Sequence, residues 1–307
     1  MVVYIDPKFI AQSEMNELIH RHPEITFVND DQNPKIEVLM IPWPKYITKE
    51  RLDRLPNVKW IQLLSAGYDG TNFDLIHEKK LIFTNAKDIY HISMAEDVLA
   101  KIFFLNRNYG HYYDNMKQGI WHPIRREPEL YESTVGILGT GSIGQTIASR
   151  LKAFNTHNIG YRQTKESVPF FDEIVSDEEG LIHLLKQSDY VIITLPLSEK
   201  TKHLIDKEKL SYLKKNAVLI NVARGDIIDQ EALVECLKKG SIRGAGLDVT
   251  TPEPLPPNHE LWALPNVLIT PHNSSSSPKL LSRLVELMDD NLTRYKMNQP
   301  LKFIVKE

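Results

Sequence analysis

Short runs of apolar residues alternate along this chain with longer stretches whose apolar positions recur at helical spacing. In the first part of the chain the runs are Val2–Ile5, Ile25–Val28, Ile36–Ile41, Trp60–Leu64 and Leu81–Thr84. Strands that alternate with helices are typical of parallel sheets, because each parallel strand needs a crossover connection. The pattern predicts a small, doubly wound α/β domain with a strand at each of these runs.

A second series of apolar runs begins at Val135 and shows the same alternation. Its members are Val135–Leu138, His157–Tyr161, Tyr190–Leu195, Ala217–Val222, Gly244–Val249 and Val267–Thr270. Between the two series, helical spacing predicts one long helix over residues 93–113, and a similar pattern predicts an amphipathic helix over residues 279–297. The second series is therefore expected to form a domain inserted into the first.

A glycine-rich turn directly follows the first strand of the second series. Its residues are Gly139, Thr140, Gly141, Ser142, Ile143 and Gly144, which fit G-x-G-x-x-G between a strand and a helix. Gly139 permits the tight turn, Gly141 lets the backbone approach a pyrophosphate, and Gly144 lets helix and strand pack closely. The helix then directs its first amide groups at the phosphates. The spacing predicts a dinucleotide site and disfavours the alternative of a glycine-rich turn without a ligand.

These features predict two doubly wound parallel-sheet domains, a Rossmann cofactor domain inserted into a flavodoxin-like substrate domain. The NAD(P)-binding domain is expected over residues 93–273, and the substrate domain over residues 1–92 plus 274–307. Ligands bind doubly wound sheets at the carboxyl ends of their strands. The active site is therefore expected in the cleft between the domains.

Composition and charge exclude several classes of protein. Of the 307 residues, 42% are hydrophobic and 25% are charged, and the net charge of −3 supplies no basic surface for nucleic acid. The apolar runs are too short to span a membrane, and the N-terminal residues lack the basic region of a signal peptide. The single cysteine, Cys236, excludes an internal disulfide framework and is expected to be a packed core thiol. We expect a cytoplasmic protein with no bound metal.

Four residues at or after the ends of predicted strands of the second series are candidates for chemistry. Arg224 follows one strand, Asp248 lies at the end of the next with Glu253 after it, and His272 follows the last. A guanidinium binds a carboxylate through two charge-assisted hydrogen bonds, and an imidazole transfers protons near neutral pH. Glu253 beside His272 would fix its tautomer and favour the imidazolium. Each residue alone has a structural alternative, such as a surface arginine or a capping aspartate, but together they predict an enzyme acting on a small anionic substrate.

The first domain adds a candidate anion-binding turn. Ala66 and Gly67 follow a predicted strand in a segment of small residues. Their backbone amides would be able to hold a carboxylate, although an ordinary strand-to-helix turn fits the spacing equally well.

The end of the second Rossmann strand bears on the choice of cofactor. Domains that prefer NAD usually carry Asp or Glu about 20 residues past the fingerprint, where it binds the ribose hydroxyls. Between Gly139 and Lys165 this chain has no acidic residue, and it offers Arg162, Thr164 and Lys165 instead. These groups suit a 2′-phosphate, so NADP(H) is expected over NAD(H). The alternative is that Arg162 only stacks on adenine.

Taken in order, these motifs resemble the D-isomer-specific 2-hydroxyacid dehydrogenase family over nearly the whole chain. The family carries the glycine fingerprint, Asn-x-x-Arg-Gly at a strand end, Asp-Val followed by Glu-Pro-Leu-Pro, and Pro-His at the last strand. The corresponding segments here are residues 139–144, 221–225, 248–249 with 253–256, and 271–272.

The resemblance assigns roles to these residues. It implies that Arg224 binds and orients the substrate, that His272 is the acid/base with Glu253 as its partner, and that Ala66 and Gly67 form the substrate-carboxylate loop. The residues that match cofactor contacts of the family are Leu195, Pro196, Thr201, Val222, Ala223 and Asp248. Family members are usually homodimers joined through the inserted domain, so the helix starting near Ser93 is expected at that interface.

Two departures from the family pattern concern cofactor and substrate. Tyr161-Arg162 stands where many relatives carry an acidic residue, which resembles the glyoxylate and hydroxypyruvate reductase branch. After His272 the chain reads Asn-Ser-Ser-Ser-Ser where relatives usually place small apolar residues, which leaves the identity of the substrate open. Further candidates for the substrate pocket, each with a core or interface alternative, are Tyr68, His91, Trp121 and Trp262.

The expected function is NAD(P)H-dependent reduction of a small 2-oxo acid to a D-2-hydroxy acid, with glyoxylate or hydroxypyruvate favoured. One alternative is a catalytically weak NAD(H)-sensing binding protein, which would not need the proton donor that this chain retains. Others are a phosphoglycerate dehydrogenase-like enzyme without a regulatory domain and a Rossmann methyltransferase. The complete strand set and the acid/base residues disfavour the methyltransferase.

Overall fold

The computed structural model describes residues 1–306, which fold as two compact units. Unit 1 contains residues 1–90 and the chain from Ser277 onward, and unit 2 contains His91–Ser276. Throughout residues 1–306, no helix combines the length and the apolar character needed to cross a membrane.

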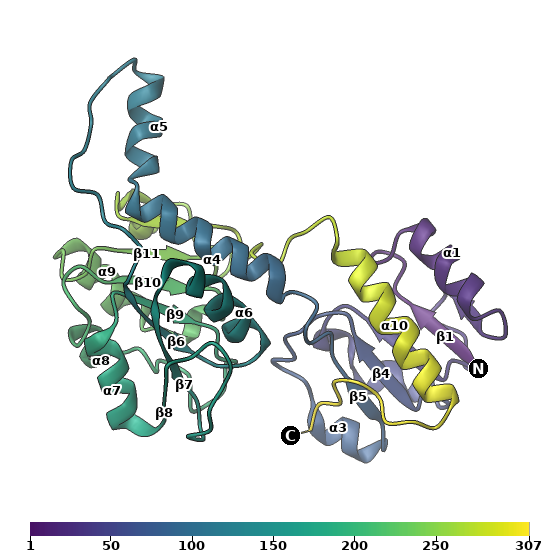
Figure 1. Ribbon diagram of the computed structural model, residues 1–307. Coiled ribbons are helices and arrows are strands. Elements are labelled where there is room, and N and C mark those ends of the chain that lie inside the picture. The colour runs from purple at the N-terminus through teal and green to yellow at the C-terminus, as the bar shows by residue number, and fades with distance from the viewer. Residues whose placement is uncertain (307) are drawn as a thin grey trace. The chain divides into compact units, whose positions relative to one another are not determined.

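Unit 1 is built on a five-stranded parallel sheet with the order β2-β1-β3-β4-β5 (Figure 1). This is the flavodoxin-like order, and every strand predicted in the first series is present. The strands are β1 (Val2–Ile5), β2 (Thr26–Val28), β3 (Val38–Ile41), β4 (Trp60–Leu63) and β5 (Ile82–Thr84). The helical elements are α1 (Gln12–Arg21), η1 (Pro44–Tyr46), α2 (Lys49–Arg54), α3 (Phe73–Glu78) and α10 (Leu280–Lys296).

Helices cover both faces of the unit 1 sheet, so β3 and β4 are buried along their whole length. Alternate residues of the strands point to opposite faces. Val3, Val38 and Trp60 pack in a core with α10, whereas Leu39 and Ile61 pack in a second core with residues of α2 and α3.

A buried hydrogen-bond network ties α10 to this sheet. The Nδ2 atom of Asn291 in α10 donates to Oε1 of Gln62 (3.0 Å), and Thr84 Oγ1 donates to the same oxygen (2.8 Å). Trp60 Nε1 donates to Thr84 Oγ1 (2.8 Å), and the backbone N of Lys302 donates to Asn291 Oδ1 (2.8 Å). The network therefore fixes α10 and the segment after it on β4 and β5.

Unit 2 contains a seven-stranded parallel sheet with the order β12-β11-β10-β9-β6-β7-β8 (Figure 1). This is the Rossmann order with one further strand, β12, at the edge. The strands are β6 (Thr134–Leu138), β7 (His157–Tyr161), β8 (Glu173–Val175), β9 (Tyr190–Ile193), β10 (Val218–Asn221), β11 (Gly244–Leu247) and β12 (Val267–Ile269). The helical elements are α4 (His91–Asn106), α5 (Tyr109–Lys117), α6 (Ser142–Leu151), η2 (Lys152–Phe154), α7 (Asp177–Gln187), α8 (Lys207–Ser211), η3 (Gly225–Ile227), α9 (Gln230–Lys238) and η4 (Glu260–Ala263).

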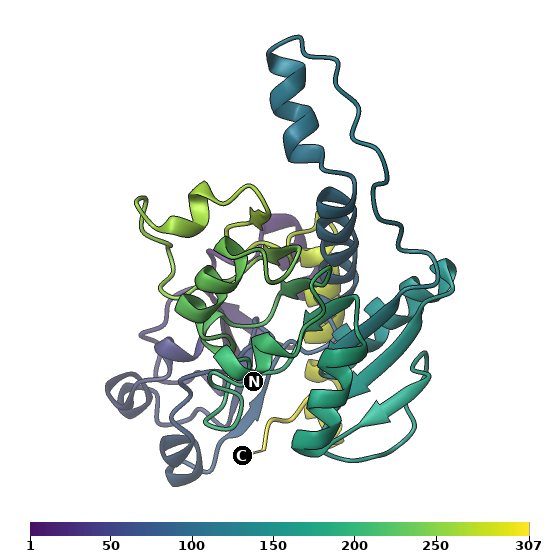
Figure 2. The same cartoon turned by 90° about the vertical axis from the view of Figure 1, so that its left-hand side faces the viewer.

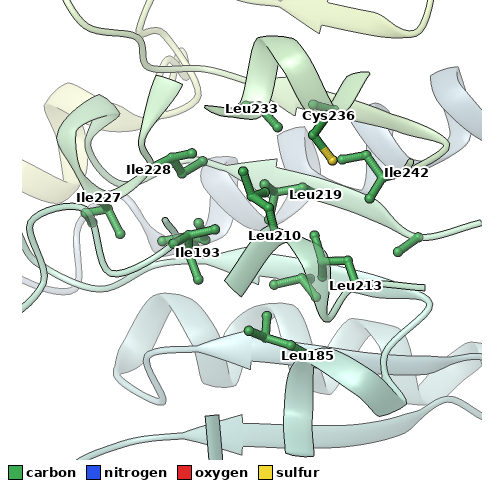
Figure 3. Packing of buried hydrophobic residues seen from close by; sticks show 14 of the residues in the cluster. Leu185, Ile193, Leu210, Leu213, Leu219, Ile227, Ile228, Leu233, Cys236 and Ile242 are labelled. Atoms are coloured by element: carbon green, nitrogen blue, oxygen red, sulfur yellow. The ribbon is translucent and has the colours of Figure 1, made fainter. Parts of the chain in front are cut away.

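Cys236 lies in the core on one face of the unit 2 sheet, as the sequence predicted. Its side chain is buried in the same apolar cluster as Leu213, Leu233 and Ile242 (Figure 3). Burial raises the pKa of its thiol, which keeps it in the neutral form and makes it a poor nucleophile.

Two expectations for unit 2 were incomplete. Strand β8 was not predicted, because three residues are too few to show a periodic pattern. The single helix expected over residues 93–113 is two helices, α4 and α5. They separate at Asn108, whose φ of 49° is a left-handed conformation that asparagine adopts more readily than most residues. Helix α5 and the chain after it project away from the unit 2 sheet (Figures 1 and 2).

Candidate active site

The glycine-rich turn joins β6 to α6 and has the geometry of a phosphate cradle. A Cβ on Gly139, where φ is 104°, would lie 2.7 Å from Thr194 Oγ1, and a Cβ on Gly144 would lie 2.0 Å from the carbonyl oxygen of Gly139. Gly141, the N-cap of α6, has nothing within 4 Å of its Cβ position. Packing thus requires glycine at positions 139 and 144. Gly141 leaves the first turn of α6, with Ser142 and Ile143, open to a pyrophosphate.

The end of β7 carries a cationic group with an acidic neighbour. Nη2 of Arg162 lies 3.5 Å from Oε2 of Glu166, and both side chains are reached by solvent. Thr164 and Lys165 are exposed in the same turn. The stretch without acidic residues, from Gly139 to Lys165, ends one residue before Glu166 and so does not include this carboxylate. A 2′-phosphate at Arg162 would compete with Glu166 for the guanidinium.

A second loop of candidate cofactor contacts follows β9. Leu195 and Pro196 begin it, and the hydroxyl of Thr201 closes it. Thr201 Oγ1 donates to the carbonyl oxygen of Pro196 (2.7 Å) and accepts from the backbone N of Ser198 (2.8 Å). These bonds hold the loop in a compact turn.

The side chain of Asn221 at the end of β10 shapes the turn that presents Arg224. Its Oδ1 accepts from the backbone N of Ala223 (3.0 Å), and its Nδ2 donates to the carbonyl oxygen of Arg224 (2.8 Å). Val222 and Ala223 are buried beneath this turn. The pattern Asn-x-x-Arg-Gly therefore encodes a local turn. Its asparagine side chain fixes the backbone that carries the arginine.

Gly225 lets this turn lie directly against the segment after β11. A Cβ at Gly225 would lie 2.3 Å from both the carbonyl carbon and the oxygen of Thr250. No other residue type fits such a contact unless the backbone moves. The Arg224 turn and the segment that leads to Glu253 are consequently in contact.

Glu253 and His272 form a hydrogen-bonded pair. Nδ1 of His272 lies 2.8 Å from Oε2 of Glu253, whose other oxygen accepts from the backbone N of Thr250 (3.1 Å). The imidazole is 47% exposed. With Nδ1 facing a carboxylate, Nε2 is the ring nitrogen that remains available to a reacting group. The arrangement suits proton transfer.

Asp248 organises the segment that carries His272. Its carboxylate accepts from Thr270 Oγ1 (2.6 Å) and from the backbone N atoms of Asn273 (3.0 Å) and Ser274 (3.0 Å), while its carbonyl oxygen accepts from His272 N (2.8 Å). Burial favours the neutral carboxyl, but hydrogen bonds from Ser274, Thr270 and Asn273 outweigh it and hold the pKa of Asp248 below its usual range. The negative charge of Asp248 therefore stabilises the segment that carries His272.

Ala66 and Gly67 lie in unit 1, in the turn after β4. Asn85 Nδ2 donates to the carbonyl oxygen of Ala66 (2.7 Å), and Ser65 Oγ donates to that of Gly67 (2.9 Å). The turn is thus fixed by side chains of its own unit.

The remaining pocket candidates have varied surroundings. Tyr68 is at the surface of unit 1, and Trp121 in unit 2 is 97% exposed. His91 begins α4, and Trp262 Nε1 donates to the carbonyl oxygen of Pro256 (3.0 Å).

Within unit 2, the structure places Arg224, Asp248, Glu253 and His272 on segments that follow three neighbouring strands, β10, β11 and β12. Sequence reasoning missed the residues that support them, among them Thr250, Thr270 and Ser274. Their only sequence signal is that small polar residues follow strand ends, which is common to most turns.

Comparisons with known proteins agree with this arrangement. Residues 99–274 match the family model described as D-isomer specific 2-hydroxyacid dehydrogenase, NAD binding domain. The chain is 35% identical over 274 residues to a glyoxylate reductase of Pyrococcus horikoshii, covering 86% of this chain and 81% of that protein. It is 33% identical over 250 residues to glyoxylate/hydroxypyruvate reductase B of Pectobacterium carotovorum, covering 80% of this chain and 78% of that protein.

A solved structure gives the same result. The D-isomer specific 2-hydroxyacid dehydrogenase of Xanthobacter autotrophicus, in complex with NADPH and MES, superimposes with a TM-score of 0.84 at 27% identity, covering 99% of this chain and 97% of that one. The family model spans more than half of the chain, and the sequence relatives match most of it. The chain therefore belongs to the D-isomer-specific 2-hydroxyacid dehydrogenase family and is an NAD(P)-dependent oxidoreductase.

Proposed function

We propose that this enzyme reduces a small 2-oxo acid, of the glyoxylate or hydroxypyruvate type, to the D-2-hydroxy acid. The observation that carries the proposal is the 2.8 Å pair of His272 and Glu253, which provides an oriented proton donor. The similarity to glyoxylate reductases and to a glyoxylate/hydroxypyruvate reductase supports this substrate class.

In the proposed reaction, His272 as imidazolium donates a proton from Nε2 to the carbonyl oxygen of the substrate. Glu253 stabilises that imidazolium, and Arg224 binds the carboxylate and polarises the carbonyl. The amides of Ala66 and Gly67 are proposed to contribute to carboxylate binding. When bound, the dihydronicotinamide supplies the hydride that C2 of the substrate receives.

We propose that unit 2 binds the cofactor and that NADP(H) is preferred over NAD(H). The fingerprint residues Gly139 to Gly144 would hold the pyrophosphate, and Arg162 with Thr164 and Lys165 would bind the 2′-phosphate. The complex of the Xanthobacter relative with NADPH supports this choice. Further cofactor contacts are proposed for Leu195, Pro196, Thr201, Val222, Ala223 and Asp248.

A homodimer joined through unit 2 is also proposed. Helix α5 and the segment after it expose several large apolar side chains, namely Tyr109, Tyr113, Met116, Ile120 and Trp121. Several large apolar side chains exposed within one short stretch of chain are typical of a protein interface. A second copy of the chain would cover it.

The test is the change in absorbance at about 340 nm, the nicotinamide band, with NADPH or NADH and a set of 2-oxo acids. Glyoxylate, hydroxypyruvate, pyruvate, 2-oxoisocaproate and phosphohydroxypyruvate cover the candidate classes. We expect oxidation of NADPH with glyoxylate or hydroxypyruvate. No oxidation with any acid, combined with tight cofactor binding, would contradict the proposal and favour an NAD(H)-sensing role.

A further inference from the structure

Gln230, the first residue of α9, contacts the segment that carries Glu253. Its Nε2 donates to the carbonyl oxygen of Thr251 (2.5 Å), and its Oε1 accepts from the backbone N of the same residue (2.9 Å). One side-chain amide thus satisfies both backbone groups of Thr251. His259 Nε2 lies farther from the same Gln230 atom, at 3.3 Å.

We propose that Gln230 is a positioning residue that holds Glu253 in register with His272. The inference rests on the acid/base roles proposed above. Thr251 lies two residues before Glu253, and the preceding residue, Thr250, donates its backbone N–H to the Glu253 carboxylate (3.1 Å). The two bonds to Thr251 therefore fix the stretch of backbone that carries Glu253. The same stretch orients the Glu253 carboxylate through the N–H of Thr250.

The chemistry of the contact selects glutamine. A carboxylate at this position would accept from Thr251 N but would face its second oxygen toward the Thr251 carbonyl, and an apolar side chain would leave both backbone groups without these partners. If the Gln230 amide were flipped, its oxygen would likewise face the Thr251 carbonyl oxygen, and two acceptors would oppose each other. The two hydrogen bonds to Thr251 therefore define the orientation of the amide.

The close contact with Gly225 does not replace this clamp, the pair of hydrogen bonds between Gln230 and Thr251. Gly225 lies against Thr250 and Thr251, but it has no side chain that could hold them. The Thr250 hydroxyl is directed within the segment, to the carbonyl oxygen of Pro252 (3.0 Å). Gln230 is thus a side chain of α9 that anchors this turn.

The first test compares Gln230→Met and Gln230→Glu with the parent enzyme. We expect each to lower kcat about 10-fold, while the KM for the 2-oxo acid and the Kd for the cofactor stay within about 2-fold, because proton transfer depends on the orientation of Glu253 and binding does not. Glu231→Ala is the matched control, because Glu231 is in the same helical turn with 84% of its side chain exposed. This control should leave kcat unchanged.

A double-mutant cycle separates positioning from general destabilisation. If Gln230 acts through Glu253, then Gln230→Met should change kcat less than about 2-fold in a Glu253→Gln background. An undiminished, multiplicative effect in that background would overturn the proposal.

The ¹⁵N resonance of His272 Nδ1 gives a readout that needs no turnover. The signal is assigned by its loss in His272→Ala, and Glu253→Gln supplies the reference for a ring without its carboxylate. We expect Gln230→Met to move the resonance toward that reference. A resonance unchanged from the parent would refute the positioning role of Gln230, even if none of the 2-oxo acids were a substrate. Failure of the positioning role can therefore be distinguished from failure of the proposed function.

Discussion

Nδ1 of His272 lies 2.8 Å from Oε2 of Glu253, and this contact joins the segments after β11 and β12. Replacing His272 with Ala should lower kcat by about 10²–10⁴-fold, because general acid catalysis contributes a factor of that size. Cofactor affinity, measured by fluorescence titration, should remain nearly intact. Turnover within a few-fold of the parent would rule out His272 as the proton donor.

Gly225→Ala should separate the Arg224 turn from the segment that leads to Glu253. The new Cβ would lie 2.3 Å from the Thr250 carbonyl group, so the backbone must move. We expect kcat/KM to fall by at least about 10²-fold, since small displacements at a reacting centre have effects of this size. Gly240→Ala is the control, because Gly240 has a positive φ and open surroundings. It should lower the melting temperature but not kcat/KM.

Arg162→Gln should weaken NADPH binding selectively. A charge-assisted contact to a 2′-phosphate is worth about 1.5–3 kcal/mol, so the Kd for NADPH should rise by about 10- to 150-fold while that for NADH stays nearly constant. Glu166→Gln should do the reverse and tighten NADPH binding, because the carboxylate no longer competes for Arg162. Equal losses for both cofactors in Arg162→Gln would instead show that the guanidinium stacks on adenine.

Trp121→Glu should convert the proposed dimer to a monomer. Trp121 is 97% exposed in this unit and lines one pocket with Met116 and Ile120, so a charge buried there would oppose association. Light scattering coupled to gel filtration measures the mass. Ile19→Glu in α1 of unit 1, also at an exposed apolar position, is the control and should leave the mass unchanged. A parent protein that is already monomeric would contradict the proposal.

Asp248 should make stability depend on pH in acid. The pKa of Asp248 in the folded protein is held below the ordinary value of 3.8. Its contribution to the free energy of unfolding is therefore present above pH 3.8 and is lost as the pH falls through the folded-state pKa. Asp248→Asn should cost about 1.5–3 kcal/mol of unfolding free energy at pH 7, because charge-assisted hydrogen bonds are lost. In urea titrations, this difference from the parent should shrink below pH 3.8. A difference that does not vary with pH would contradict the charged role.

The sequence predicted the features that local spacing encodes and missed those that depend on side chains from separate segments. The fingerprint at Gly139–Gly144 and the strands before Arg224 and His272 are contiguous patterns, and the structure contains them. The clamp between Gln230 and Thr251 joins residues 21 apart. Nothing in either segment alone specifies such a partner, which only packing brings within hydrogen-bond distance.

The break between α4 and α5 illustrates a second limit. The apolar spacing continues across Asn108, but the backbone there turns left-handed. Asn108 Nδ2 donates to Glu127 Oε1 (3.2 Å), and Arg107 pairs with the same carboxylate at 3.1 Å. A distant glutamate thus contributes to ending a helix that the periodicity alone would extend.

The backbone at His272 has a φ of 50°, a conformation that histidine, asparagine and aspartate tolerate and that β-branched residues strongly avoid. The loop is held mainly through backbone atoms by Asp248, so its shape does not require an imidazole. Evolution or redesign could therefore exchange this side chain for asparagine at little conformational cost and keep the scaffold. Given the proton-donor role proposed for His272, such a variant would keep the cofactor-binding fold and lose proton transfer. A catalyst and a non-catalytic receptor would then differ here by one residue.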